Sequence, residues 1–173
     1  MIEGILMKRM TGMILVILMY VIFPAEKLSS QSRIKWYDFN SGITLAMKQK
    51  KPVVINFFSN SCHWCRVMDQ ETFSNRSVVR RIKKYYIAVK VNFDSSDSII
   101  LEGQRFSARE FATLLGVDGI PATIFMDKNG RFITHIPGYI KTNTFLPLLG
   151  YVRNECYKKQ VSFQDYLNGV DCN

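Results

Sequence analysis

The apolar positions along the chain have two different spacings, which separate the expected strands from the expected helices. Residues 53–58 read Val-Val-Ile-Asn-Phe-Phe, a nearly continuous apolar run, which predicts a strand covered on both faces. Between residues 38 and 50, apolar side chains recur with helical spacing, which predicts a helix that Pro52 ends. The same criteria predict further helices at 62–70, 74–84, 107–115, 142–158 and 162–167, and further strands at 86–92, 121–126 and 131–136.

Two of these strands are expected to form a hairpin. Residues 121–126 and 131–136 are joined by Asp-Lys-Asn-Gly, and Asn-Gly between two apolar runs is a strong turn signal. The polar segment 94–106 is expected to be a loop with a short helical piece. The order of elements predicts an α/β fold, in which a mixed central sheet is flanked by helices and ends in a terminal β-hairpin and a closing helix.

The first thirty residues have the layout of a secretory signal. Lys8 and Arg9 precede an apolar run at 13–23, and polar residues follow it. A membrane span needs ~20 apolar residues, so this run is short, and an uncleaved anchor through residues 13–23 is the alternative interpretation. We therefore expect residues 1–30 to be a signal peptide or N-terminal anchor, and residues 31–173 to be a domain in the periplasm or another secretory compartment.

Composition is that of one folded domain, because 47% of the 173 residues are hydrophobic and 21% are charged. The net charge is +9, and most of the basic residues belong to the domain rather than to the signal. These residues are scattered and accompany no nucleic-acid-binding motif, so no nucleic-acid partner is expected. A membrane is an expected partner only if the N-terminal segment stays uncleaved.

Two cysteines supply the candidate chemistry. Cys62 and Cys65 lie where the strand at 53–58 gives way to the helix at 62–70. Unpaired N–H groups and the helix dipole stabilise a thiolate at a helix N-terminus, which predicts Cys62 as the nucleophile and Cys65, one turn later, as the resolving thiol. Half of a zinc site and a pair of buried thiols are the alternatives. The chain has no second Cys-x-x-Cys and no His-x-x-x-His, so no metal is expected.

A proline later in the chain completes a pattern that resembles the thioredoxin superfamily. Pro121 opens a predicted strand 59 positions after Cys62, and a hairpin follows. The resemblance covers roughly residues 34–157, and it implies a thioredoxin fold with a short C-terminal extension. It also implies that the peptide bond before Pro121 is cis and faces the cysteine pair. Ile120 would then expose backbone groups with which an extended substrate segment can pair.

Three short segments indicate a particular branch of this superfamily. Residues 61–68 read Ser-Cys-His-Trp-Cys-Arg-Val-Met, residues 137–139 read Pro-Gly-Tyr, and residues 162–167 read Ser-Phe-Gln-Asp-Tyr-Leu. Together they are similar to small exported thioredoxin-like proteins of the SoxW type. That similarity implies a thiol:disulfide oxidoreductase, favoured as a dithiol reductant of exported partner proteins that receives electrons from a membrane thiol-transfer protein. No cofactor is expected.

Three residues near the cysteine pair are expected to modulate it. Ordinary thioredoxins have a buried Asp six positions before the nucleophile, and this chain has Asn56 there. Because Asn cannot titrate, we expect slower deprotonation of Cys65 unless Glu71, His63 or a water substitutes. A protonated His63 would favour the thiolate, and Trp64 is expected to form an apolar docking surface. These features leave the redox direction open.

Other assignments stay open as well. A bridge between Cys156 and Cys172 would pin the C-terminal tail, although four cysteines formally allow three connectivities. The alternative activities are a disulfide oxidant or isomerase, a partner-binding module regulated by its thiols, and a copper chaperone that adds His63, His135 or Met68 to the cysteine pair. Copper chaperones on this fold usually space their cysteines Cys-x-x-x-Cys, which counts against the last alternative. We expect His135 on the surface of a strand and Met68 in the core.

Overall fold

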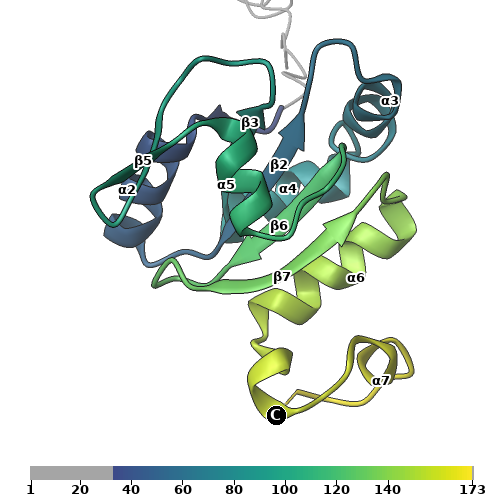
Figure 1. Cartoon of the computed structure of the whole chain (residues 1–173). Coiled ribbons are helices and arrows are strands. Elements are labelled where there is room, and N and C mark those ends of the chain that lie inside the picture. The colour runs from purple at the N-terminus through teal and green to yellow at the C-terminus, as the bar shows by residue number, and fades with distance from the viewer. Residues whose placement is uncertain (1–32, 173) are drawn as a thin grey trace, which may run out of the picture. The chain divides into compact units, whose positions relative to one another are not determined.

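A five-stranded sheet forms the centre of the domain, with the strand order β1-β3-β2-β6-β7 (Figure 1). The computed structural model describes residues 33–172, so the expected signal peptide or anchor at residues 1–30 lies outside the described part. The strands are β1 (Trp36–Tyr37), β2 (Val53–Phe58), β3 (Ile87–Asn92), β6 (Ala122–Met126) and β7 (Phe132–Pro137). β1, β3 and β2 run parallel, whereas β6 pairs antiparallel with both β2 and β7. The predicted mixed sheet and terminal hairpin are confirmed.

Helices cover both faces of this sheet, as Figure 1 shows. They are α2 (Phe39–Gln49), α3 (His63–Glu71), α4 (Arg76–Tyr85), α5 (Ala108–Leu114) and α6 (Thr142–Arg153). Successive side chains of a strand point to opposite faces. Ile55 of β2 therefore packs in one core with α2 and α5, whereas Val54 packs in the other with α3, α4 and α6. Among residues 33–172, no helix is long and apolar enough to cross a membrane.

The segment 94–106 differs from the prediction. It contains a second, two-stranded sheet, β4 (Ile99–Leu101) and β5 (Gln104–Phe106), instead of a short helical piece. Gly103 has a φ of +81° in the turn between them, a conformation that glycine adopts without steric cost. Asn40 of α2 holds the hairpin, because its side chain donates to the Ser98 carbonyl and accepts from the Ile100 N–H, both at 2.8 Å. The prediction was wrong because the local pattern contains no sign of this distant anchor.

The closing helix is shorter than predicted. α6 ends at Arg153 rather than near residue 158, and a 3-10 helix, η1 (Cys156–Lys159), follows. Glu155 between them has a φ of 54°, which is left-handed and ends the regular helix. The predicted short helix after it is confirmed as α7 (Phe163–Leu167).

The C-terminal extension packs back against α6. The ring of Tyr151 meets those of Phe163 and Tyr166 edge-on, with centroids 5.5 and 5.7 Å apart. Gly150 leaves the space for this contact, because a Cβ at that position would lie 2.5 Å from the Tyr166 hydroxyl oxygen. The extension is therefore seated on a helix of the domain and is not a loose tail.

Candidate active site

The cysteine pair lies at the start of α3, just beyond the carboxyl end of β2. Cys62 is the N-cap of α3, and its Sγ accepts a hydrogen bond from the Cys65 backbone N–H at 3.1 Å. Hydrogen bonds from backbone N–H groups and the positive end of a helix dipole both favour a thiolate over a thiol. The sequence prediction that Cys62 lies at a helix N-terminus is confirmed.

The two sulfurs form a disulfide with an S–S distance of 2.06 Å and a Cα–Cα distance of 5.3 Å. The two members differ in exposure, since Cys62 is half-buried and Cys65 is only 5% exposed. An incoming partner sulfur can therefore reach Cys62, whereas Cys65 faces the interior. This asymmetry suits an attacking thiol and an internal resolving thiol.

Pro121 lies at the same end of the sheet as the cysteines. The Ile120–Pro121 peptide bond is cis, and the Pro121 carbonyl accepts from the Gly138 N–H at 2.8 Å. The next residue, Ala122, pairs with Phe57 near the carboxyl end of β2. The antiparallel pairing of β6 with β2 therefore places Ile120 and Pro121 at the end of the sheet from which α3 starts. Pro121 is buried there, and Ile120 is half-buried.

Asn56 lies on the face of β2 that α3 covers, and it is 2% exposed. Its amide donates to the Ala122 carbonyl at 3.4 Å, which ties β2 to β6. Its neighbours in register are Lys90 on β3 and Thr123 on β6. The Thr123 hydroxyl is buried and has no hydrogen-bond partner within the described part of the chain. A polar row therefore crosses the sheet beneath α3.

An aromatic surface stands beside the cysteines. Trp64 is 56% exposed and stacks on Tyr139, with ring centroids 5.8 Å apart and an interplanar angle of 25°. The ring of His63 meets Trp64 edge-on at 5.4 Å. Tyr139 donates its hydroxyl hydrogen to Glu71 of α3, and that hydrogen bond raises the pKa of the tyrosine. Trp64 lies at the surface rather than in the core, as predicted, whereas Tyr139 was part of a predicted resemblance and had no role assigned to it.

Two further hydrogen bonds join the Tyr139 loop to α3. The Thr72 hydroxyl donates to the Ile140 carbonyl at 2.6 Å, and the Thr142 hydroxyl donates to the Glu71 carbonyl at 2.9 Å. Together with the Tyr139–Glu71 hydrogen bond, they hold the loop after β7 against the end of the cysteine-bearing helix. Trp64 and Tyr139 therefore form one surface built from two segments of the chain.

The residues proposed for copper do not gather into a metal site. Met68 is fully buried in the core under α3, as predicted. His135 is half-buried on β7 rather than on the open surface, and its Nε2 is shielded from solvent. Among residues 33–172, no group of three or more His, Cys, Asp or Glu side chains could hold a metal ion.

The structure also pairs the other two cysteines. Cys156 and Cys172 form a disulfide with their Cα atoms 5.0 Å apart, and both are buried.

Sequence reasoning missed one interaction near the cysteines, the ion pair between Lys90 of β3 and Asp69 of α3, whose charged atoms are 2.7 Å apart. The only signal in the sequence is that Asp69 lies four positions after Cys65, on the same face of the helix.

Residues 39–153 match the family model of the thioredoxin-like domain, and the chain therefore belongs to that family. Human spermatogenesis-associated protein 20 is 30% identical over 60 residues, which are 34% of this chain and 8% of that protein. The thiol:disulfide interchange protein DsbD of Campylobacter jejuni is 26% identical over 96 residues, which are 56% of this chain and 15% of that protein. The matched regions thus span less than a fifth of these curated relatives.

Solved structures agree on the fold. A thioredoxin-fold protein from Helicobacter pylori has a TM-score of 0.58 at 23% identity, covering 70% of this chain and 80% of that one. A thioredoxin from Thermus thermophilus has a TM-score of 0.57 at 23% identity, covering 69% and 86%. The predicted thioredoxin fold is therefore confirmed.

Proposed function

We propose that this protein is a thiol:disulfide oxidoreductase that uses Cys62 and Cys65 as its redox couple. The observation that carries the proposal is the disulfide at the start of α3, in which Cys62 caps the helix and Cys65 lies behind it. Membership of the thioredoxin-like family supports it. So does the similarity to DsbD, which is named for thiol:disulfide interchange, although the match covers a small part of that protein.

The reaction begins with the reduced couple. The Cys62 thiolate attacks a disulfide of the partner, so that a mixed disulfide forms and one partner sulfur leaves as a thiolate. Cys65 then loses its proton and attacks Cys62, which closes the internal disulfide and releases the second partner sulfur. The partner gains two electrons and two protons, and the couple loses them. Read in the opposite direction, the same steps oxidise a dithiol partner.

We infer that the natural substrates are exported proteins, and that the direction is reduction. Trp64 offers an exposed apolar contact next to Cys62, and Ile120 lies where an extended partner segment can pair with its backbone. The apolar run at residues 13–23 supports export or anchoring of the SoxW type. A reductant outside the cytosol needs a donor of electrons, for which a membrane thiol-transfer protein is the suitable class.

A redox titration of the Cys62–Cys65 couple against glutathione tests the direction. A potential well below the poise of the compartment supports a reductant, whereas a potential above it supports an oxidant or isomerase. Reduction of insulin by the reduced domain tests the activity itself, with Cys62→Ser as the matched inactive variant. Equal insulin reduction by the parent and by Cys62→Ser would refute the proposed function.

A further inference from the structure

The resolving step of the proposed function needs a group that takes a proton from Cys65. The side chain of Cys65 is 5% exposed, and burial in apolar surroundings disfavours the thiolate. Only the thiolate attacks a disulfide, so the proton must leave during resolution. A general base positioned near the thiol accelerates such a transfer by ~10²- to 10⁴-fold.

Asn56, which lies beneath α3, cannot serve as this base. Its side chain is an amide, which does not take up a proton, and its nitrogen donates a hydrogen bond to the Ala122 carbonyl. Glu71 lies six positions beyond Cys65 and already accepts the hydroxyl hydrogen of Tyr139. Asp69 lies four positions beyond Cys65, and residues with this spacing are neighbours on one face of a helix, with Cβ atoms about 5 to 6 Å apart.

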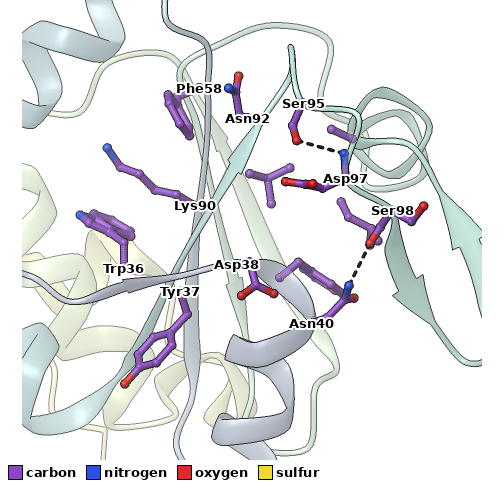
Figure 2. A pocket seen from close by; sticks show the side chains of 14 residues that line it. Trp36, Tyr37, Asp38, Asn40, Phe58, Lys90, Asn92, Ser95, Asp97 and Ser98 are labelled. Carbon is purple, nitrogen blue, oxygen red and sulfur yellow. Dashed lines mark hydrogen bonds between the residues drawn. The ribbon is translucent and has the colours of Figure 1, made fainter.

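Lys90 fixes the position of the Asp69 carboxylate. Its Nζ donates to both carboxylate oxygens at 2.7 Å. The Lys90 side chain lies between the rings of Trp36 and Phe58 (Figure 2). It is 18% exposed, and its Nζ lies 5.1 and 4.8 Å from the two ring centroids. Cation–π contacts on two sides and two short hydrogen bonds leave the ammonium little freedom.

The ion pair includes a member of the polar row that crosses the sheet beneath α3, since Lys90 belongs to that row. Lys90 pairs with Asn56 across β3 and β2, and both side chains lie on the face that α3 covers. Other charged groups of α3 are directed elsewhere, since Arg66 donates to the Asn60 carbonyl and Glu71 contacts Tyr139. Asp69 is therefore the carboxylate of α3 that the four-residue spacing places on the same side of the helix as Cys65.

The pair also has access to solvent. The Asp69 side chain is 42% exposed, and a cavity of about 680 Å³ borders Lys90 between β1, β3 and the segment 95–99. Polar groups around this cavity also hold its turns, because the Asn40 amide donates to the Ser98 carbonyl (Figure 2) and accepts from the Ile100 N–H. Because the Asp69 side chain is exposed, solvent around it can carry a proton away from the carboxylate.

We propose that Asp69, positioned by Lys90, accepts the proton of Cys65 during the resolving step. As the Cys65 proton passes to the Asp69 carboxylate, directly or through one water, the sulfur electron pair forms the bond to Cys62. The bond between Cys62 and the partner breaks, and its electron pair leaves on the partner sulfur as a thiolate. Asp69 then returns the proton to solvent. This inference rests on the proposed function and adds a base to its second step.

Rapid acid quench followed by intact mass measurement separates the two steps. The reduced full-length protein is mixed with excess glutathione disulfide, and the glutathione adduct on Cys62 is followed over time. In Asp69→Asn, we expect adduct formation at the parent rate and adduct decay slowed by about 10-fold or more near neutral pH. The difference should narrow as pH rises above the ordinary thiol pKa of about 8.5, because solvent base then removes the proton.

Matched variants separate the role of a base from a loss of folding. Asp69→Glu keeps a carboxylate and should restore most of the decay rate, whereas Lys90→Gln releases the carboxylate and should slow decay with formation unchanged. Asp94→Asn is the control, because Asp94 has similar exposure, at 45%, and is also ion-paired, with Arg109. It should behave as the parent does.

The outcomes are distinct. Parent-like adduct decay in Asp69→Asn would overturn the inference, as would equal slowing of formation and decay, or equal slowing in Asp94→Asn. If Asp69→Asn does not fold, parent-like decay in Lys90→Gln overturns the inference. If the parent itself forms no adduct that Cys65 resolves, the proposed function fails and not only the role of Asp69.

Discussion

The two disulfides lie toward opposite ends of the central sheet (Figure 1), and their surroundings differ. At the carboxyl end of β2, Cys62 and Cys65 are three positions apart, at a helix N-terminus and beside an exposed Trp64. Beyond the other end, Cys156 and Cys172 are 16 positions apart and both buried, in the C-terminal extension. The same covalent bond is therefore suited to exchange where a helix stabilises one sulfur, and to cross-linking where the sulfurs are enclosed.

The largest expected effect is on turnover at the Cys62 end. Cys62→Ser should lower disulfide reduction to the uncatalysed level, because no thiolate remains to attack a partner. Cys65→Ser should form a stable mixed disulfide with the partner, which non-reducing electrophoresis detects. Reduction of insulin by Cys62→Ser at the parent rate would contradict a redox role for the Cys62–Cys65 disulfide.

The next effect is on stability, at the other disulfide. Replacing both Cys156 and Cys172 by Ala should lower the free energy of unfolding by about 3 kcal/mol, the value expected for a loop of roughly 15 residues. Denaturant unfolding measures this change. Insulin reduction by the folded variant should match the parent. A several-fold loss of turnover in the folded variant would show that the two ends are coupled.

A smaller effect is expected at the aromatic surface. Trp64→Ala should raise the KM for a protein partner by about 10-fold, since truncating an interface aromatic commonly costs more than 1 kcal/mol of binding. Reduction of glutathione disulfide, which is too small to cover this surface, should be unchanged. Leu114→Ala is the matched control, because Leu114 is 59% exposed on α5, against the other face of the sheet. An equal change in KM for both variants would contradict a docking role.

The smallest effect concerns Asp127, in the turn after β6. Burial alone would raise its pKa, but hydrogen bonds from the Asn129 and Arg131 backbone N–H groups and the Arg131 guanidinium outweigh burial, so the pKa is lowered. A lowered pKa in the folded state adds stability above the unfolded value of about 3.9, and this stability is lost as pH falls through the folded value.

Asp127→Asn should therefore cost about 1 kcal/mol of unfolding free energy at neutral pH. The difference from the parent should shrink as pH falls below about 4 and vanish below the lowered folded pKa, which denaturant unfolding across a pH series measures. Asp97→Asn, at an exposed carboxylate, serves as the control. A difference between parent and Asp127→Asn that persists in acid would show that the turn does not depend on the charge.

Most of the fold could be predicted from the sequence, because its central elements have strong local patterns. The apolar run of β2, the turn at residues 127–130 and the cysteine pair at the start of α3 are local features, and each lies where it was expected. The hairpin of β4 and β5 could not be predicted, because Asn40 holds it from 60 positions away. The two-residue strand β1 is too short to have a pattern.

The residues of the candidate site also fall into those that a local pattern predicts and those that depend on distant segments. Cys62 and Cys65 are recognisable because their spacing and their place before a helix are both local. The stack of Trp64 on Tyr139 and the ion pair of Asp69 with Lys90 join residues that are distant in sequence. Both contacts depend on how separate segments of the chain are arranged around α3. A pattern along one segment does not report which side chain of another segment lies opposite it.

Gly150 makes the seating of the C-terminal extension depend on one missing side chain. It lies within the residues that match the family model, yet the group that needs its empty space, Tyr166, lies beyond them. A Cβ at that place would also lie 3.2 Å from a guanidinium nitrogen of Arg81 on α4. Any larger side chain at position 150 would therefore push Tyr166 away from α6 and loosen the seat of the extension.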